Sequence, residues 1–205
     1  MDLQVIDINN KKISQIDVSD VMAEKVNKKI LYYAVKAARN NLHHGTAKVK
    51  DRSEINKTNK KTYRQKGTGN ARHGARRANI FVGGASTHGP RPRSFSEQVN
   101  KQFKKRSYQE VFKYLIQENK LKVLNEINFA KASTKEAAAI LAKLELIKAL
   151  VVLPAENETA KKSFRNLKDV GVVNEININL YDMLRYDAVV MTEEYFKQVK
   201  ERYAL

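Results

Sequence analysis

The first forty-five residues change from a strand-like to a helix-like spacing of apolar positions. Apolar and polar residues alternate over Leu3–Asp7 and Ile13–Val18, on either side of the polar Asn9-Asn10-Lys11, which predicts two strands joined by a turn. From Lys28 to His43 the apolar spacing becomes helical, and Gly45 follows as a stop signal. The apolar stripe of this expected helix consists of Leu31, Val35, Ala38 and Leu42.

After residue 99 the chain alternates between helix and strand patterns. The expected strands are Lys122–Ile127, Ala149–Leu153, Val172-Val173 and Ala188–Met191. The expected helices are Asn100–Glu118, with Val111, Leu115 and Ile116 facing inward, and Thr134–Leu144, Asn157–Asn166, Leu180–Leu184 and Glu193–Tyr203. Two of the strands are apolar throughout, as strands buried on both faces should be. This alternation predicts an α/β fold, a single domain with a mostly parallel sheet flanked by helices.

The intervening segment has a different composition. Residues 46–93 hold 13 Lys and Arg against two acids, and no carboxylate occurs from Ile55 to Ser96. Seven of the eight glycines lie between Gly45 and Gly89, and only 11 of these 48 residues are apolar. Such a stretch buries too little surface to offset the entropy lost on ordering, so we expect it to be mobile alone. We therefore predict a globular domain of residues 1–45 and 94–205, with 46–93 inserted as an extended loop reaching at most ~80 Å.

Charge narrows the class of partner. The chain has 39 Lys and Arg against 22 Asp and Glu, a formal net charge of +17, which favours nucleic acid. A membrane surface would require a basic amphipathic helix, and the excess charge does not sit on one. Cysteine is absent, which excludes disulfides and thiolate chemistry and fits a reducing cytoplasm. The opening residues Met1–Gln4 include an early acid and no basic or apolar leader, so we expect neither secretion nor organellar import.

The motifs for nucleotide binding, metal binding and catalysis are incomplete. Gly84 and Gly89 have phosphate-loop spacing, but Pro90 and Arg91 follow, and proline removes a required N–H. The run Gly67–Gly69 begins like a dinucleotide fingerprint but has Arg72 at the third glycine position. The four histidines lack neighbouring acids at metal-binding spacing, and no serine lies near both a histidine and a carboxylate. We expect no enzyme activity, cofactor, metal or small-molecule substrate.

The inserted segment has the composition of an RNA-binding surface. Glycine allows the backbone to lie close against phosphates. The arginine guanidinium forms paired hydrogen bonds with phosphates and also stacks on bases. Tyr63, His73 and Phe81 are candidates to stack on unpaired bases; alternatively Tyr63 and Phe81 anchor the segment to the domain. The helix after the segment begins with several cations, and positive charge at a helix N-terminus is unfavourable because it opposes the helix dipole. A phosphate bound nearby would offset this cost. The predicted RNA-binding residues are Lys57, Lys60, Lys61, Tyr63, Arg64, Gln65, Lys66, Arg72, His73, Arg76, Arg77, Arg91, Arg93, Lys101, Lys104, Lys105 and Arg106.

Three stretches resemble one known family. Residues 60–74 read KKTYRQKGTGNARHG, residues 83–93 contain Gly-Gly followed by Gly-Pro-Arg-Pro-Arg, and residues 180–187 read LYDMLRYD. In order and over essentially the whole chain, they resemble the bacterial form of large ribosomal subunit protein four. The family usually has Trp at the position of Tyr63 and Arg at that of Asn70, so this chain has a smaller stacking face and one positive charge fewer at the loop tip.

The resemblance implies a structural, cytoplasmic protein of the large ribosomal subunit. Its partners would be large-subunit (23S-type) ribosomal RNA, neighbouring large-subunit proteins and the nascent peptide. It further implies that the loop tip lines the peptide exit tunnel, with Lys66, Gly67, Thr68, Gly69, Asn70, Ala71 and Arg72 as the lining residues. Two other classes stay open: an RNA-modifying enzyme with a cofactor-binding α/β domain, and a DNA-compacting protein. The first would need a glycine-rich turn between strand and helix, and Gly171, the only glycine outside the segment and its borders, does not supply one.

Overall fold

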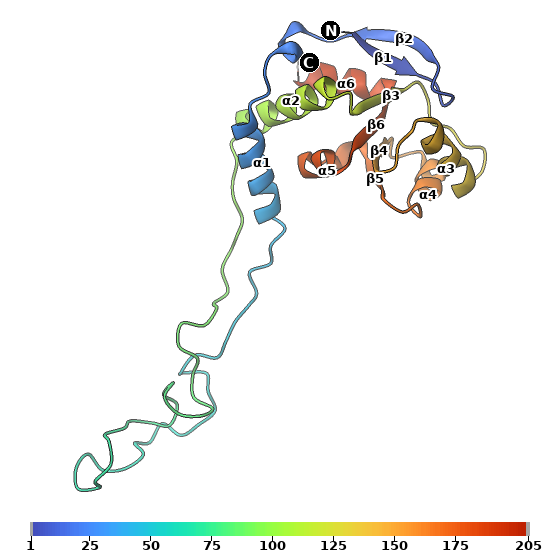
Figure 1. Cartoon of the computed structure of the whole chain (residues 1–205). Coiled ribbons are helices and arrows are strands. Elements are labelled where there is room, and N and C mark those ends of the chain that lie inside the picture. The colour runs from blue at the N-terminus through green and yellow to red at the C-terminus, as the bar shows by residue number, and fades with distance from the viewer. Residues whose placement is uncertain (1, 204–205) are drawn as a thin grey trace. The chain divides into compact units, whose positions relative to one another are not determined.

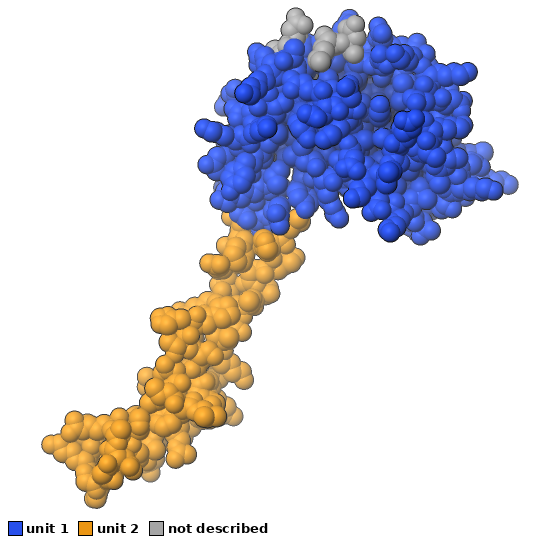
Figure 2. All heavy atoms as spheres, in the orientation of Figure 1, with its two compact units in different colours: residues 1–41, 97–205 blue, residues 42–96 orange. Residues whose placement is uncertain are grey.

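The computed structural model describes residues 2–203 and falls into two compact units (Figure 2). Unit 1 comprises residues 1–41 and 97–205, and unit 2 comprises Leu42–Ser96. Every helix and strand formed by the described residues belongs to unit 1. Unit 2 consists of turns and irregular backbone.

The core of unit 1 is one six-stranded sheet (Figure 1). Its strand order is β2-β1-β3-β6-β4-β5, and every neighbouring pair is parallel except β1 with β2. The strands are β1 Asp2–Ile6, β2 Lys12–Asp17, β3 Leu121–Leu124, β4 Ala149–Leu153, β5 Val170–Asn174 and β6 Ala188–Thr192. The predicted mostly parallel sheet is confirmed.

Helices cover both faces of the sheet. They are η1 Asp20–Ala23, α1 Lys28–Asn40, α2 Lys101–Gln117, α3 Thr134–Lys143, α4 Glu158–Phe164, η2 Glu175–Asn177, α5 Leu180–Arg185 and α6 Glu193–Tyr203. Strand β4 shows the two layers directly: Leu150 and Val152 join the cluster with α2, α5 and α6, whereas Ala149, Val151 and Leu153 join the cluster with α3 and α4. All five residues are buried, which confirms β4 as a strand covered on both faces.

The boundaries expected from the sequence are corrected at several elements. The first helix ends at Asn40 rather than His43, because Asn41 forms the C-cap and turns its amide toward Glu97. Leu42 is therefore off the helix, in unit 2, and 62% exposed, while Leu31 and Val35 pack against the core as predicted. Strand β3 is shorter than expected, η1 was missed, and α3 begins at the N-cap Ser133, whose hydroxyl accepts from the N–H of Glu136.

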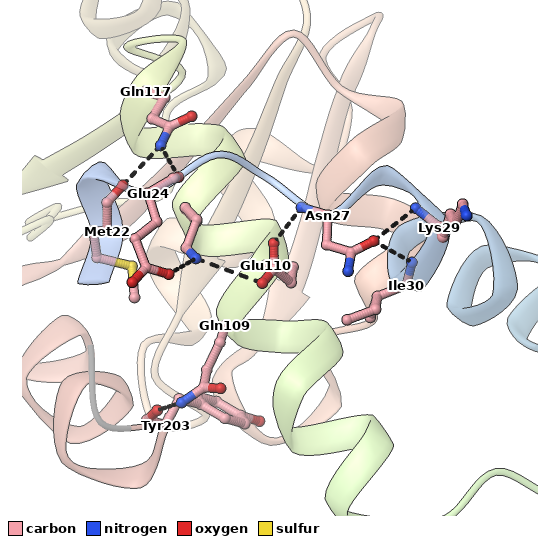
Figure 3. A network of polar contacts seen from close by, with 10 residues as sticks. Met22, Glu24, Asn27, Lys29, Ile30, Gln109, Glu110, Gln117 and Tyr203 are labelled. Carbon is pink, nitrogen blue, oxygen red and sulfur yellow. Dashed lines mark hydrogen bonds and ion pairs between the residues drawn. The ribbon is translucent and has the colours of Figure 1, made fainter.

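A buried polar network joins α2 to the chain that leads into α1 (Figure 3). Lys113 Nζ lies 3.5 Å from Glu110 Oε1 and 3.6 Å from Glu24 Oε2, and the Lys113 and Glu110 side chains are buried. The other carboxylate oxygen of Glu110 accepts from the N–H of Asn27, the N-cap of α1, at 2.7 Å. Gln117 donates to the carbonyls of Met22 and Glu24. The network fixes where α1 starts relative to α2, the two helices that flank unit 2 in the sequence.

Candidate nucleic-acid interface

The two ends of unit 2 run side by side as a pair of closely spaced backbone legs. The N–H of Arg93 donates to the carbonyl of Gly45 at 3.0 Å, and the N–H of Val49 donates to that of Pro90 at 3.2 Å. A Cβ atom on Gly45 would lie 1.6 Å from the Arg93 carbonyl oxygen, and one on Gly89 would lie 2.1 Å from Val49 Cγ2. Glycine is required at both positions because the opposite leg leaves no room for a side chain.

Both carboxylates of unit 2 pair with cations of the same unit. Glu54 forms an ion pair with Lys48, and Asp51 Oδ2 lies 3.5 Å from the Arg91 guanidinium. The bond from Lys48 holds the pKa of Glu54 below its ordinary value. These pairs are exposed, so they add little to stability. Their consequence is electrostatic: Lys48 and Arg91 take up both acids, so the other 11 of the 13 Lys and Arg have no carboxylate of the unit to balance them.

Consecutive turns over residues 75–84 shape the middle of unit 2. The N–H of Phe81 donates to the carbonyl of Ala78 at 3.1 Å, and the N–H of Gly84 donates to that of Phe81 at 2.8 Å. Two predicted RNA-binding residues brace these turns. Lys57 Nζ donates to the Val82 carbonyl at 2.8 Å, and Arg77 Nε donates to the Lys57 carbonyl at 2.6 Å. Part of their hydrogen-bonding capacity therefore holds the segment's own shape.

A thirteen-residue loop closes at Thr62 and Gly74 and contains the predicted tip. Thr62 donates to the Gly74 carbonyl from both its N–H, at 3.1 Å, and its hydroxyl, at 2.8 Å. Arg64 donates to the carbonyl of Gly67 at 2.7 Å. Gly67 and Gly69 have φ values of +80° and +71°, which side-chain-bearing residues rarely adopt. The loop therefore turns on its glycines.

The aromatic residues form a cluster within unit 2. The His73 ring centroid lies 6.2 Å from that of Tyr63 and 5.0 Å from that of Phe81, both edge-on. The Tyr63 hydroxyl donates to the carbonyl of Ala71. Tyr63 and Phe81 thus pack against a residue of the segment itself. The three rings are half-buried, so each retains exposed surface.

The predicted cations are mostly exposed. Exposed side chains within the segment are Lys60, Lys61, Arg64, Gln65, Lys66, Arg72, Arg76, Arg91 and Arg93, and half-buried ones are Lys57, Tyr63, His73 and Arg77. In unit 1, Lys101, Lys104, Lys105 and Arg106 are exposed on the first two turns of α2. The prediction missed the polar residues Asn59, Asn79 and Ser86, which line a hollow in unit 2, because nothing in their spacing distinguishes them from loop residues.

Three specific features are not found in the described part of the chain: a cofactor-binding turn at Gly171, a cluster of side chains that could hold a metal, and a membrane-spanning helix. Gly171, the glycine considered for a cofactor turn, lies inside β5, where a Cβ would meet the Tyr186 hydroxyl at 2.5 Å. The absence of a side chain at Gly171 leaves room for the Tyr186 ring, which follows α5. Among the side chains that the structure describes, no three His, Asp or Glu residues gather as a metal site would require. No helix within residues 2–203 is long and apolar enough to cross a membrane.

Comparison with known proteins decides the family. The model of the Ribosomal protein L4/L1 family matches residues 16–202. This chain belongs to that family. Large ribosomal subunit protein uL4 of Geotalea uraniireducens is 37% identical over 199 residues, covering 97% of this chain and 96% of the relative. The uL4 proteins of Geobacter sulfurreducens and Halothermothrix orenii are each 35% identical, over 97% and 95% of this chain and 96% and 95% of their own lengths. Membership of the L4/L1 family confirms the resemblance seen in the sequence.

Proposed function

We propose that this L4/L1 family member is a structural constituent of the large ribosomal subunit that binds large-subunit ribosomal RNA mainly through residues 46–93. The chain is a ribosomal protein and not an enzyme, and the family relationship leaves the alternative of an RNA-modifying enzyme without support. The inserted segment is the part that enters the RNA. The four cations at the start of α2 extend the contact onto unit 1.

One observation carries the assignment of the segment to RNA. No residue from Leu42 to Ser96 is buried, so unit 2 has no core of its own. The unit holds 13 Lys and Arg, and its two carboxylates are already paired with two of these cations. A unit without a core gains order from what surrounds it. Phosphates supply both the counter-charge and the hydrogen-bond acceptors that these side chains need. The backbone bends at glycines, which let it approach a phosphate chain closely.

The tip loop fits a role along the nascent-peptide tunnel. Residues 66–72 occupy the far part of the loop closed by Thr62 and Gly74, and six of these seven residues are exposed, Thr68 being half-buried. Lys66 and Arg72 would provide a cationic lining, while Gly67 and Gly69 would allow the backbone itself to face the lumen. The remaining partners are neighbouring large-subunit proteins, and the site of action is the cytoplasm.

The test compares RNA and DNA under matched conditions. The purified full chain is titrated with a structured large-subunit ribosomal RNA fragment and with duplex DNA of equal length, at equal salt. Charge alone would bind both polymers, so a clear preference for the structured RNA supports the proposal. Co-sedimentation of the chain with large ribosomal subunits from cell extract is the second readout. Equal affinity for both polymers together with absence from the subunit peak would refute it.

A further inference from the structure

Unit 2 contains a hollow that the general RNA-binding role does not require. It has a volume of about 950 Å³ and is lined by residues of the segment's two sides, between Asp51 and Asn59 and between Arg77 and Arg91. A volume of this order is typical of pockets for small organic ligands. Most of its lining is polar, and its aliphatic members include Ala78 and Ala85. We call it the polar hollow.

The charge of the polar hollow suits a phosphate. Arg52, Arg77 and Arg91 line it against a single carboxylate, that of Asp51. Asp51 already faces Arg91 at 3.5 Å, so the hollow keeps an excess of positive charge. Arg77 is held by the bond from its Nε to the Lys57 carbonyl, which orients the guanidinium and leaves its two terminal nitrogens outside that bond. A preoriented guanidinium loses less freedom when it binds an anion.

The neutral groups of the polar hollow suit a base edge. Asn59 and Asn79 offer side-chain amides, each with both donor and acceptor atoms, as the edge of a nucleobase does. The Asn79 amide donates to the hydroxyl of Thr87, so its position is fixed. His88 lines the same hollow with an imidazole ring, at a φ of +53° that non-glycine residues rarely adopt. Strained backbone of this kind clusters at functional sites.

We propose that the polar hollow receives one unpaired nucleotide of the bound RNA, with the arginines on its phosphate and the two asparagines on its base. This inference rests on the proposed function and names the element of RNA that this part of unit 2 recognises. An acidic peptide is the poorer occupant for two reasons. Binding a carboxylate does not require the Asn59 and Asn79 amides or the His88 ring, and the carboxylate of Asp51 would repel another carboxylate. Unpaired nucleotides are also the feature through which proteins read irregular RNA.

The test fills the polar hollow without changing charge. Ala85→Leu places a bulky side chain in its wall, and Ala155→Leu makes the same change at an exposed turn of unit 1 as a matched control. Asn79→Ala removes an amide of the hollow, with Asn166→Ala, at an exposed position of unit 1, as its control. Each full-length variant is bound to large-subunit ribosomal RNA, and unpaired bases are probed with dimethyl sulfate and with a 2′-hydroxyl acylating reagent.

The expected result is local. At least one unpaired nucleotide protected by the unmodified protein and by both controls should become at least fivefold more reactive with Ala85→Leu and with Asn79→Ala, while overall affinity stays within twofold. Identical protection maps for all five proteins would overturn the inference and leave the proposed function standing. Cross-linking of the hollow to an acidic side chain of a neighbouring protein would overturn it too. Failure of the unmodified chain to bind the RNA would refute both.

Discussion

The backbone N–H of Glu97 donates to the side-chain oxygen of Asn41 at 2.8 Å, although 56 positions separate the two residues in the sequence. The Asn41 amide donates back to the Glu97 carbonyl at 3.4 Å, and the Asn40 amide donates to the Glu97 carboxylate at 2.9 Å. These bonds hold together the two points where unit 2 leaves and rejoins unit 1. The two points are therefore joined by residues of unit 1 itself, and residues 42–96 are not needed to hold them together.

Replacing residues 42–96 by a short Gly-Ser linker should leave unit 1 folded. Every buried residue of the described chain lies in unit 1, and shortening a loop lowers its closure entropy, so stability to urea should not fall. Far-ultraviolet circular dichroism during urea titration measures this. Deletion of residues 60–80 alone serves as the intermediate case, with the legs kept. An unfolded product in either case would show that the segment contributes to the fold of the domain.

Arg64→Ala and Lys66→Ala should each weaken RNA binding and reduce its salt dependence. Both side chains are exposed in the tip loop, and removing one side chain that neutralises a phosphate lowers the slope of log affinity against log salt by about one unit. Lys131→Ala, an exposed lysine of unit 1, is the charge-matched control and should change neither quantity. Filter binding at several salt concentrations gives the slopes. If the slopes are unaltered, these side chains do not neutralise phosphates.

Lys113→Met should destabilise unit 1 by roughly 3–5 kcal/mol, because it leaves the buried carboxylate of Glu110 without its cation. The double variant Lys113→Met with Glu110→Gln should recover part of the loss, since no buried charge then remains. Lys162→Met is the control: Lys162 is paired with Glu158 at 3.2 Å on the exposed side of α4, and its loss should cost about 0.5 kcal/mol or less. Chemical denaturation measures all three. Equal effects of Lys113→Met and Lys162→Met would contradict the stabilising role of the network.

Tyr195→Phe should change how stability depends on pH in alkali. Burial, with Tyr203 and Glu175 nearby, raises the pKa of Tyr195 to about 12, against an ordinary value near 10. The neutral phenol therefore contributes stability that is complete below about pH 10 and is lost as the pH rises through about 12. At pH 7 the phenylalanine variant should be less stable by about 1 kcal/mol, because the bond from the hydroxyl to the Glu175 carbonyl is gone.

Between pH 10 and pH 12 the deficit of Tyr195→Phe should shrink, because the Tyr195 phenol then ionises in the unfolded chain but stays neutral in the folded protein, which destabilises only the unmodified protein. Tyr108 and Tyr203 also have pKa values raised by burial, so both proteins retain some alkaline instability. Thermal denaturation at pH 7 and pH 11 measures the difference. Tyr33→Phe, on an exposed tyrosine of α1, is the control and should show no pH-dependent change. A constant deficit across this range would mean that Tyr195 titrates as it does in the unfolded chain.

The sequence predicted the architecture well where local pattern and burial agree. Strand β4 is uniformly apolar and uniformly buried, and α2 hides Val111, Leu115 and Ile116 as its spacing required. Errors fell where a tertiary contact decides a boundary. The end of α1 is set by Asn41 turning toward Glu97, a partner 56 residues away, and no local signal marks it.

The candidate interface was predictable in composition but not in geometry. The absence of acids over 42 residues identified the segment, yet no pattern of residue types predicts that Lys57 and Arg77 brace a turn. Lys57 reaches the Val82 carbonyl beside Gly83, which has a φ of +72° and where a Cβ would lie 2.8 Å from Lys57 Nζ, and neither property can be read from the order of residue types. The polar hollow is formed in part by the same turns, so the sequence did not predict it either.

The pairing of the legs at Gly45 with Arg93 and at Val49 with Pro90 constrains how a partner RNA is assembled around the segment. Both ends of the segment are tied to unit 1, so no free terminus exists that could be drawn through an already closed ring of nucleotides. Both legs would have to pass through such a ring together, with the tip loop first and the turns over residues 75–84 behind it. For the RNA binding proposed above, the RNA must therefore still be open when this chain docks, so docking would precede the final closure of the RNA around the segment.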